Sequence, residues 1–432
     1  MAKYVITSAQ YGAPIHTDFS KSLKKYCEVN NAELIVIPTS GKSIHDDTLD
    51  SRIEENAVIS DSYKLNSNIR VSDYAIKPQQ IDPSTGLARF TQTKESTIFA
   101  SPKQRLKVVP TSNVAIPRMM WTTGAITKPN YNDNRIGRIA HGDHVYGAIV
   151  AEIVDDKHYH VRPIRALYNG TFIDLGIKYD GEKDPSQAGL EAIVFGDWHV
   201  GDTNQTVEKV NHELIKTFNP KRIILHDVFN GHSVNHHNVD KSISRASELD
   251  RHNLEKELSD NYNTLKYLSD GPHKTIVVAS NHHEFLNRYL ESGRYVNDPA
   301  NLKIAAKLIP DFIDGKNPYE VGVNLFGKLP NTKFLRRDED YKVLGWQLGA
   351  HGDKGVNGAR PGINSTEASF GKSITGHTHT PEVLRNTVVV GTSTNLRLNY
   401  TDGPSTWMNT HAFLYDNGQV QLVNIIDGKY RV

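Results

Sequence analysis

The sequence Gly376-His377-Thr378-His379 closes a series of short motifs that are rich in metal-binding side chains. The motifs before it, in chain order, are Gly196-Asp197-Trp198-His199, His226-Asp227, Asn281-His282 and Ala350-His351-Gly352. Each of these four follows an apolar run that predicts a buried strand: AIVFG, RIIL, TIVVA and LGWQLGA, respectively. Ligands of open α/β sheets bind at the carboxyl ends of the strands. We therefore expect five distant segments to bring carboxylate, amide and imidazole groups together at one metal site.

The types of side chain in these motifs favour divalent cations. A carboxylate such as Asp227 has two oxygens and can bridge two ions. Neutral imidazole suits Zn and Fe, whereas carboxylate and amide oxygens leave Mn and Mg open. Two ions about 3.5–4 Å apart clamp both the attacking and the leaving oxygen of a phosphoryl displacement. The pattern therefore predicts two divalent metal ions and chemistry at a phosphate ester.

In this order, the five motifs resemble those of the calcineurin-like metallophosphoesterase superfamily, whose pattern is D-x-H, G-D, G-N-H-[DE], H and G-H-x-H. The resemblance covers residues 188–425. It implies an α/β fold in which a two-sheet sandwich is flanked by helices. It also implies that Asp227 bridges the two ions and that a metal-bridging hydroxide attacks phosphorus. The implied ligands are Asp197, His199, Asp227 and His379 for the first ion, and Asp227, Asn281, His351 and His377 for the second.

The resemblance further implies a catalytic role for His282, which would stabilise the transition state or protonate the leaving oxygen. The sequence departs from the family pattern around this residue, because His283 follows it and Glu284 is displaced one place beyond the usual acidic position. His283 is therefore an alternative for the role. Glu284 is interpreted either as a charge at a helix N-terminus or as support for a histidine. We interpret two further acids near the motifs, Asp202 and Asp353, as solvated loop residues.

The segment His226-Asp227-Val228-Phe229-Asn230-Gly231-His232 resembles the G-D-[LI]-F-[DH] motif of nucleases that repair double-strand breaks, and phage-encoded DNases built on the same catalytic domain. His226 stands where the family usually has glycine and is a candidate beside the metals. Phe229 either packs beneath the site or faces substrate, and His236-His237-Asn238 adds polar donors. The expected function is a metal-dependent phosphodiesterase, a DNA nuclease, with Mn as the expected metal and Fe, Zn or Mg as alternatives. The alternative function is a phosphomonoesterase, either a nucleotidase or a protein phosphatase, with the N-terminal region as a lid.

Composition limits the remaining classes of function. The chain has 50 Lys and Arg residues against 49 Asp and Glu, so no overall charge draws it to nucleic acid. The single cysteine, Cys27, excludes internal disulfides and fits a reducing compartment. No run of 18 apolar residues predicts a membrane span, and the start of the chain lacks the organisation of a signal peptide. We expect a cytoplasmic protein of a bacterial cell or a phage-infected host.

At 432 residues, the chain is long enough for two domains. We predict an accessory α+β region over residues 1–187 and the metallophosphoesterase domain over residues 188–432. Strands are predicted at 3–8 and 33–37 around a helix at Phe19–Val29, a β-rich stretch at Arg105–Tyr179, and helices at Thr203–Phe218 and Lys241–Leu268. The string His141-Gly142-Asp143-His144 imitates a metal motif but is predicted to be a loop. The sequence shows no internal repeat. It leaves open whether the N-terminal region binds DNA, caps the site or forms a homo-oligomer.

Overall fold

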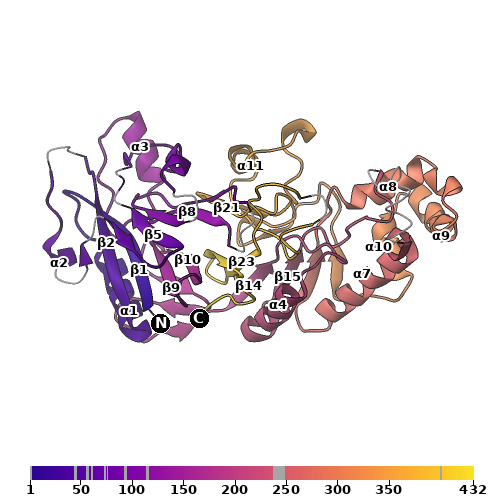
Figure 1. Ribbon diagram of the computed structural model, residues 1–432, viewed down its shortest axis with the longest axis horizontal. Coiled ribbons are helices and arrows are strands. Elements are labelled where there is room, and N and C mark those ends of the chain that lie inside the picture. Colours follow the sequence, from indigo (N-terminus) through magenta and orange to yellow (C-terminus); the bar gives the residue numbers. More distant parts are fainter. Residues whose placement is uncertain are drawn as a thin grey trace.

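The computed structural model shows an α/β protein in which several sheets pack in layers with helices outside them (Figure 1). It describes residues 2–42, 46–54, 58–59, 62–72, 74, 76–91, 95–112, 116–236, 249–398 and 401–432. None of the helices in these ranges has the length and apolar character needed to span a lipid bilayer. The predicted α/β class is confirmed.

The sheet that carries the first predicted ligands has the strand order β17-β16-β15-β14-β23-β24. Its strands are β14 (Leu190–Val194), β15 (Arg222–Leu225), β16 (Lys274–Val277), β17 (Thr332–Phe334), β23 (Thr410–Tyr415) and β24 (Val420–Asn424). Strands β14 to β17 are parallel to one another, and β23 pairs antiparallel with β14 and forms a hairpin with β24. Helices α4 (Gln205–Phe218) and α7 (Leu254–Ser269) bury their apolar residues with those of the sheet. The apolar runs of the sequence thus form strands that are covered on both faces.

A second sheet is built from the beginning of the chain and has the order β10-β9-β1-β2-β3. Its strands are β1 (Ala2–Gln10), β2 (Ala32–Thr39), β3 (Val58–Ile59), β9 (Gly147–Ile153) and β10 (Tyr159–Arg165). Helix α1 (Thr17–Asn30) connects β1 to β2, and its buried residues Phe19, Leu23 and Tyr26 pack against the sheet. The strand, helix and strand predicted at the start of the chain are confirmed.

The third sheet joins the two parts of the chain and has the order β18-β19-β20-β22-β21-β7-β8-β6-β5-β4. Its early strands are β4 (Tyr63–Lys64), β5 (Ile69–Ser72), β6 (Ser96–Phe99), β7 (Arg105–Val109) and β8 (Arg118–Thr122). Its late strands are β18 (Lys342–Val343), β19 (Trp346–Gln347), β20 (Ser373–Thr375), β21 (Glu382–Leu384) and β22 (Thr387–Val389). The two sets meet where β7 pairs antiparallel with β21. We therefore refer to residues 2–165 and 190–424 as the N-terminal and C-terminal halves, and the predicted domain boundary at residue 187 stays a prediction.

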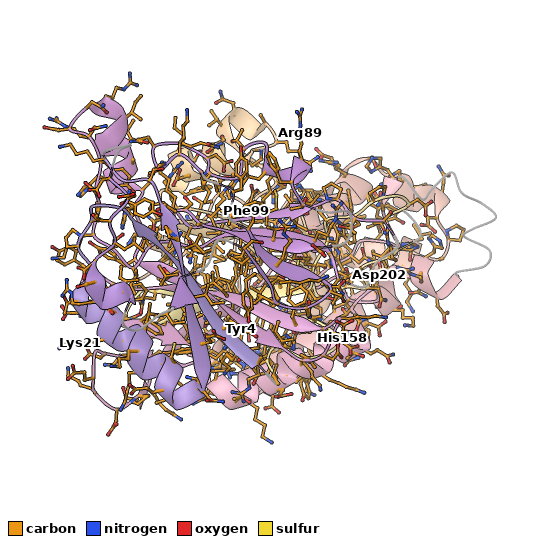
Figure 2. All side chains as sticks on the ribbon, turned by 60° about the vertical axis from the view of Figure 1, so that its left-hand side comes forward. Tyr4, Lys21, Arg89, Phe99, His158 and Asp202 are labelled. Carbon is orange, nitrogen blue, oxygen red and sulfur yellow. The ribbon has the colours of Figure 1, made fainter. Side chains whose placement is uncertain are left out.

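The five-stranded and six-stranded sheets share one hydrophobic core with the ten-stranded sheet. This core includes Ile35 of the second sheet, Val194 of the first, and Ile98, Trp121 and Val388 of the joining sheet. The helices lie outside these layers, and Figure 2 shows the Lys21 side chain on the outer surface of α1. Burial of these apolar residues is the dominant favourable contribution to folding.

The remaining elements surround this framework. The helices are α2 (Ser51–Glu54), α3 (Arg135–Gly142), α8 (His283–Glu291), α9 (Leu302–Ile313), α10 (Pro318–Asn324) and α11 (Ile363–Phe370). A small sheet between the halves contains β11 (Phe172–Asp174), β12 (Ile177–Tyr179) and β13 (Ser186–Gln187). Short 3-10 helices span Leu87–Arg89, Leu249–His252, Arg294–Asn297 and Val356–Gly358.

Several sequence predictions differ from these boundaries. The helix expected at Lys241–Leu268 begins at Leu254, and residues 237–248 lie outside the described ranges. The run LGWQLGA contributes only the two residues of β19. His141 and Gly142 end α3, so the predicted loop there begins at Asp143. The β-rich stretch predicted at Arg105–Tyr179 is confirmed, apart from α3.

Candidate metal centre

The predicted ligands follow the carboxyl ends of strands from two different sheets. Asp197 and His199 follow β14, Asp227 follows β15, Asn281 follows β16, His351 follows β19, and His377 and His379 follow β20. The strands of one sheet supply the first three motifs and those of the ten-stranded sheet supply the last two. The site therefore lies where the carboxyl ends of both layers meet.

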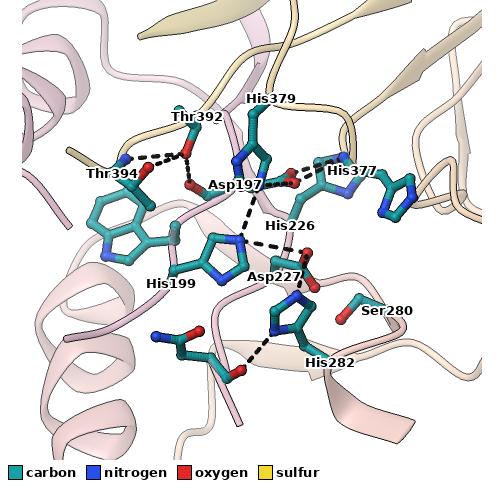
Figure 3. A network of polar contacts seen from close by, with 12 residues as sticks. Asp197, His199, His226, Asp227, Ser280, His282, His377, His379, Thr392 and Thr394 are labelled. Carbon is teal, nitrogen blue, oxygen red and sulfur yellow. Dashed lines mark hydrogen bonds and ion pairs between the residues drawn. The ribbon is translucent and has the colours of Figure 1, made fainter. Parts of the chain in front are cut away.

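The first cluster contains Asp197, His199, Asp227 and His379, each of which is buried and offers a ligand atom within 4.8 Å of the others. His379 Nε2 lies 3.1 Å from Asp197 Oδ2 and 3.1 Å from His199 Nε2, which is 3.7 Å from Asp227 Oδ2 (Figure 3). Two ligands that are each about 2.1 Å from a metal ion lie about 3–3.5 Å apart in a tetrahedral site. The observed separations match this spacing, so the cluster can hold a metal ion.

The second cluster shares Asp227 with the first and adds His351 and His377, again within 4.8 Å of one another. His351 Nε2 lies 3.0 Å from Asp227 Oδ2. The structure thus brings together all six of the predicted carboxylate and imidazole ligands, and Asp227 belongs to both groups. Asn281 follows the neighbouring strand β16, beside His282.

The donor atoms of this site include buried groups that nothing else satisfies. Within the described residues, Asp227 Oδ1 and Asn281 Oδ1 are buried without a hydrogen-bond partner. A buried polar atom without a partner is destabilising unless a ligand or an ion compensates it. Carboxylate, amide and imidazole groups are together the donor set of a divalent cation. The residues present therefore fit a bound metal ion.

The ligand loops have an unusual backbone conformation. Four predicted ligands lie in the left-handed region although none is glycine: His199 (φ 47°), Asp227 (φ 43°), His377 (φ 75°) and His379 (φ 58°). Such conformations are uncommon for residues with a side chain and cluster at functional sites. Here they turn the chain sharply after each strand, so that the side chains point inward.

Glycine at position 376 is required by the close approach of the first cluster. A Cβ atom built at Gly376 would lie 2.2 Å from Asp197 Oδ1 and 3.1 Å from Cγ of His226. The residue after it, His377, donates its backbone N–H to Asp197 Oδ2 at 2.9 Å. The GHTH segment therefore positions a carboxylate of the other sheet as well as its own imidazoles.

The charges of the site explain its titration. Burial would raise the pKa of Asp197, but the charges of His351 and His379 outweigh it and lower that pKa to about 2. Burial lowers the pKa of His199 to about 3, with a further contribution from His282. Burial also opposes the charged form of His351, but Asp227 and Asp197 raise its pKa to about 9. Asp197 and Asp227 therefore remain ionised and His199 is neutral, whereas a cation in the second cluster would have to displace the proton of His351.

His282 is the histidine that faces the cluster. Its Nδ1 lies 2.6 Å from the carbonyl oxygen of Asn230, so this nitrogen donates and Nε2 is left for the site. Nε2 lies 3.9 Å from Asp227 Oδ2, and the side chain remains 20% exposed (Figure 3). The ring also contacts that of His199, with 4.6 Å between the centroids.

His283 has a different environment. Its Nδ1 accepts the Ser280 N–H at 3.1 Å, and its ring stacks against Tyr319 with a centroid separation of 4.3 Å. Burial lowers its pKa to about 3. The candidate catalytic role therefore falls to His282 by position, whereas His283 packs in the interior.

Two further candidates lie away from substrate. Phe229 is fully buried and packs against His283 and Tyr319, so its alternative role facing substrate is wrong. Glu284 lies in the first turn of α8 and forms an ion pair with Arg337 at 3.0 Å. The described contacts of Glu284 are with basic residues rather than with His282.

His226 lies behind the cluster. It is fully buried, its Nδ1 is 3.4 Å from Nδ1 of His351, and burial lowers its pKa to about 4. Its carbonyl accepts the Trp198 N–H. This side chain therefore packs against a ligand and does not reach an open surface.

The prediction that Asp202 and Asp353 are solvated is wrong. Asp202 is 7% exposed and accepts hydrogen bonds from Asn230 Nδ2 and Arg251 Nη2, both at 2.7 Å. Asp353 pairs with Arg337. Sequence spacing gives no sign of these contacts, because each partner lies on a distant segment. His237 and Asn238 lie outside the described residues.

These observations define an α/β protein with a buried Asp/His cluster suited to metal binding. The chain is 27% identical over 466 aligned residues to the protein named Protein A1 of Escherichia phage T5. That similarity covers 99% of this chain and 82% of the phage protein. No protein-family model and no solved structure matches the chain. The similarity therefore extends through both halves and is not confined to the metal motifs.

Proposed function

We propose that this protein is a metal-dependent phosphodiesterase that hydrolyses DNA, using two divalent cations in a metallophosphoesterase fold. The observation that carries the proposal is the convergence of two ligand clusters that share Asp227. The fold assignment is supported by two sheets that contribute ligands from their carboxyl ends, with helices α4 and α7 packed outside the first sheet. Mn²⁺ is the expected cation, and Fe, Zn and Mg remain alternatives because the site mixes oxygen and imidazole donors.

The first cluster would hold one cation through Asp197, His199, Asp227 and His379. The second would hold the other through Asp227, His351, His377 and Asn281. When bound, the cations would activate water and neutralise charge on the phosphate. Asp227 would fix the separation of the two sites, since it contributes to both.

The protein itself contributes proton transfer through His282. Its Nδ1–H bond to the Asn230 carbonyl fixes the ring so that Nε2 points towards Asp227. A protonated Nε2 would donate to the leaving oxygen, and a neutral one would accept a proton. The exposed fifth of this side chain gives it access to a substrate bound at the surface.

The choice of DNA as substrate rests on the resemblance of residues 226–230 to the nuclease motif. The alternative is a phosphomonoesterase, which would use the same cations. A panel of substrates separates the two: supercoiled plasmid, linear duplex, single-stranded DNA and nitrophenyl phosphate, each incubated with protein and Mn²⁺. We expect cleavage of DNA, and hydrolysis of the monoester alone would establish the alternative.

The matched control for this assay is a pair of Asp-to-Asn variants. Asp227→Asn should abolish hydrolysis, because the shared ligand loses its charge. Asp427→Asn should have no effect, because Asp427 is exposed and asparagine tolerates its left-handed backbone (φ 50°). Equal activity of both variants would contradict the assignment of the site.

A further inference from the structure

The two halves of the chain repeat the same arrangement of strands. In the N-terminal half, β1 pairs parallel with β2 and antiparallel with β9, which continues as a hairpin with β10. In the C-terminal half, β14 pairs parallel with β15 and antiparallel with β23, which continues as a hairpin with β24. The sheet orders β10-β9-β1-β2-β3 and β24-β23-β14-β15-β16 therefore correspond strand by strand.

The ten-stranded sheet reads the same from either edge. From one edge, β4–β5 is antiparallel, β5–β6 and β6–β8 are parallel, and β8–β7 is antiparallel. From the other edge, β18–β19 is antiparallel, β19–β20 and β20–β22 are parallel, and β22–β21 is antiparallel. The order of parallel and antiparallel pairings is therefore the same from both edges of the sheet.

The junction has the geometry of a two-fold axis. Trp121 and Val388 are equivalent, because each lies three residues before a glycine, Gly124 or Gly391, whose carbonyl accepts the N–H of Ser8 or Asp197, respectively. Leu106 of β7 faces Trp121 of β8, and Val383 of β21 faces Val388 of β22, so Leu106 and Val383 are also equivalent. These two residues lie directly opposite each other where β7 meets β21. Only a two-fold rotation normal to the sheet brings equivalent residues of antiparallel strands face to face in this way.

Backbone hydrogen bonds at the strand ends also match. In the N-terminal half, Ser8 donates its N–H to the Gly124 carbonyl and accepts from the Ile126 N–H. In the C-terminal half, Asp197 donates to Gly391 and accepts from Ser393. Ser8 therefore occupies the position of the metal ligand Asp197.

The helices that follow these strand ends are alike in length and in capping. Helices α1 and α4 each have 14 residues. His16 and Asn204 cap them through their side chains, and Asn31 and Asn219 end them in the left-handed conformation. The match extends from the sheets to the turns that connect them.

From this correspondence, we propose that the N-terminal half is a second copy of the fold that carries the metal centre, and that this copy has lost its ligands. The proposed repeat lies in the strand arrangement and not in the motifs, which is why the sequence alone predicts no internal repeat. The chain is a fused pseudo-dimer, and the Asp/His clusters found among its described residues lie wholly in the C-terminal half.

The residues at the equivalent positions are not metal ligands. Gln10 corresponds to His199, because Gln10 lies two residues after Ser8 and His199 lies two residues after Asp197. Phe99 of β6 corresponds to Thr375 of β20, since β6 and β20 pair with equivalent strands. Ser101 and Lys103 therefore stand where the GHTH motif has its two histidines.

These replacements have structural partners of their own. Gln10 Oε1 accepts the Asn130 N–H at 3.1 Å. Lys103 Nζ donates to the Gln80 carbonyl at 2.8 Å and lies 3.5 Å from Asp143 Oδ2. In the described part of the N-terminal half, no group of three or more Asp, Glu, His or Cys side chains is arranged to hold a metal ion.

The experiment is a count of bound metal in the full-length protein. Protein loaded with Mn²⁺ is gel-filtered, and Mn is measured by mass spectrometry in the wild type, in Asp197→Asn/Asp227→Asn, and in Gln10→Ala. We expect the double variant to lose nearly all its Mn and Gln10→Ala to retain the wild-type amount. Retention of Mn by the double variant would overturn the proposal, whereas a wild type that binds no Mn would contradict the proposed function instead.

A second measurement tests the duplication without reference to metal. In an experimentally determined structure, a half-turn about an axis between Leu106 and Val383 should superimpose β1, β2, β9 and β10 on β14, β15, β23 and β24. A different strand order in either half would overturn the proposal.

An independent set of contacts identifies a positioning residue beside the metal centre. Asp202 accepts from Asn230 Nδ2 at 2.7 Å, and the carbonyl of the same Asn230 accepts from His282 Nδ1 at 2.6 Å. Arg251 holds the other carboxylate oxygen of Asp202 at 2.7 Å. We infer that Asp202 orients His282 through Asn230, a role that the displaced Glu284 does not fill; this inference rests on the proposed function.

The test is a double-mutant cycle on DNA hydrolysis. Asp202→Ala should lower kcat by about 10–100-fold and leave the Mn content unchanged, whereas Asp260→Ala, a control in α7 whose side chain is 45% exposed and pairs with Lys256, should have no effect. In a His282→Ala background, Asp202→Ala should cause no further loss, because the residue acts through the histidine. Additive losses would refute the positioning role, whereas an inactive wild type would refute the proposed function.

Discussion

The most specific consequence of the site geometry concerns Gly376. Replacement by alanine adds a single methyl group, and the backbone there lies outside the left-handed region, so the new residue is not strained by its dihedral angles. The methyl carbon would, however, lie 2.2 Å from Asp197 Oδ1, where ordinary contacts are 3.4–4 Å. The perturbation therefore acts by steric contact, chiefly on the proposed ligand Asp197 and to a smaller extent on His226, whose Cγ would lie 3.1 Å from the new carbon.

The size of the effect follows from that distance. To restore an ordinary contact, the Asp197 carboxylate or the GHTH loop must move by more than 1 Å. Metal–ligand distances tolerate changes of only about 0.2 Å. A misplacement of about 1 Å at a reacting centre lowers activity by about 100-fold, which corresponds to about 2.7 kcal/mol in the activation barrier.

The assay compares Gly376→Ala with Gly142→Ala, because a Cβ at Gly142 meets no atom within 4 Å. Mn²⁺ affinity is measured by calorimetric titration, DNA hydrolysis by gel assay, and folding by circular dichroism. We expect Gly376→Ala to remain folded while it loses metal affinity and activity, and Gly142→Ala to behave as the wild type does. Gly376→Ala with wild-type Mn²⁺ affinity would show that Asp197 does not bind metal at this position.

Three further predictions follow from the same structure. His282→Ala should retain its Mn²⁺ but slow hydrolysis by about 10²–10⁴-fold, whereas His283→Ala should chiefly lower the melting temperature; metal loss by His282→Ala would make that residue a ligand. Arg162→Met should lower the free energy of unfolding, measured in urea, by about 3–5 kcal/mol, because it removes the buried cation that Glu152 and Asp174 share. Lys3 then remains as the cation beside Glu152, and the neutral donors Tyr26 and Gln421 remain beside Asp174. Burial opposes the ionised form of Glu152, but Arg162 outweighs this effect and lowers the pKa of Glu152 to about 2. The wild type should therefore lose the stability that this ion pair contributes as the pH falls from about 4.5 towards 2. Arg162→Met should lose less stability over the same range. Amide exchange should be slower in the long strands β1 and β2 than in the shorter strands β14 and β15. The reverse order would contradict the inference that the site shortens the regular strands beside it.

The ligand set was predictable from sequence because its chemistry is local. Each ligand follows an apolar run, and strand ends of neighbouring strands meet, so order along the chain was enough to bring His199, Asp227 and His379 together. The structure confirms this convergence for the carboxylate and imidazole ligands. The sequence could not predict which of His282 and His283 faces the site, because adjacent residues at the start of a helix point to different sides. The packing of Tyr319 against His283 decides which ring is buried.

Contacts between distant segments were not predictable. Asp202 has two partners, Asn230 and Arg251, which come from other loops. The burial of Asp202 therefore leaves no pattern in the sequence around it. The repeat was missed for a related reason. The motifs that make the C-terminal half recognisable contain the Asp and His residues that we propose as metal ligands, and the equivalent positions identified in the N-terminal half lack such residues. What the two halves retain is alternating burial and strand order, which many unrelated sequences satisfy.

The comparison of the halves indicates what the proposed metal centre requires of the fold. In the N-terminal half, β1 has nine residues and continues in extended conformation to Gln10, and β2 has eight. In the C-terminal half, β14 and β15 have five and four residues, and the chain then turns through left-handed residues at His199 and Asp227. The centre therefore replaces regular strand pairing with strained turns, which persist because the surrounding structure holds them. A copy that does not bind metal has no such requirement, and there β1 extends through Ser8 and Gln10, the positions equivalent to Asp197 and His199.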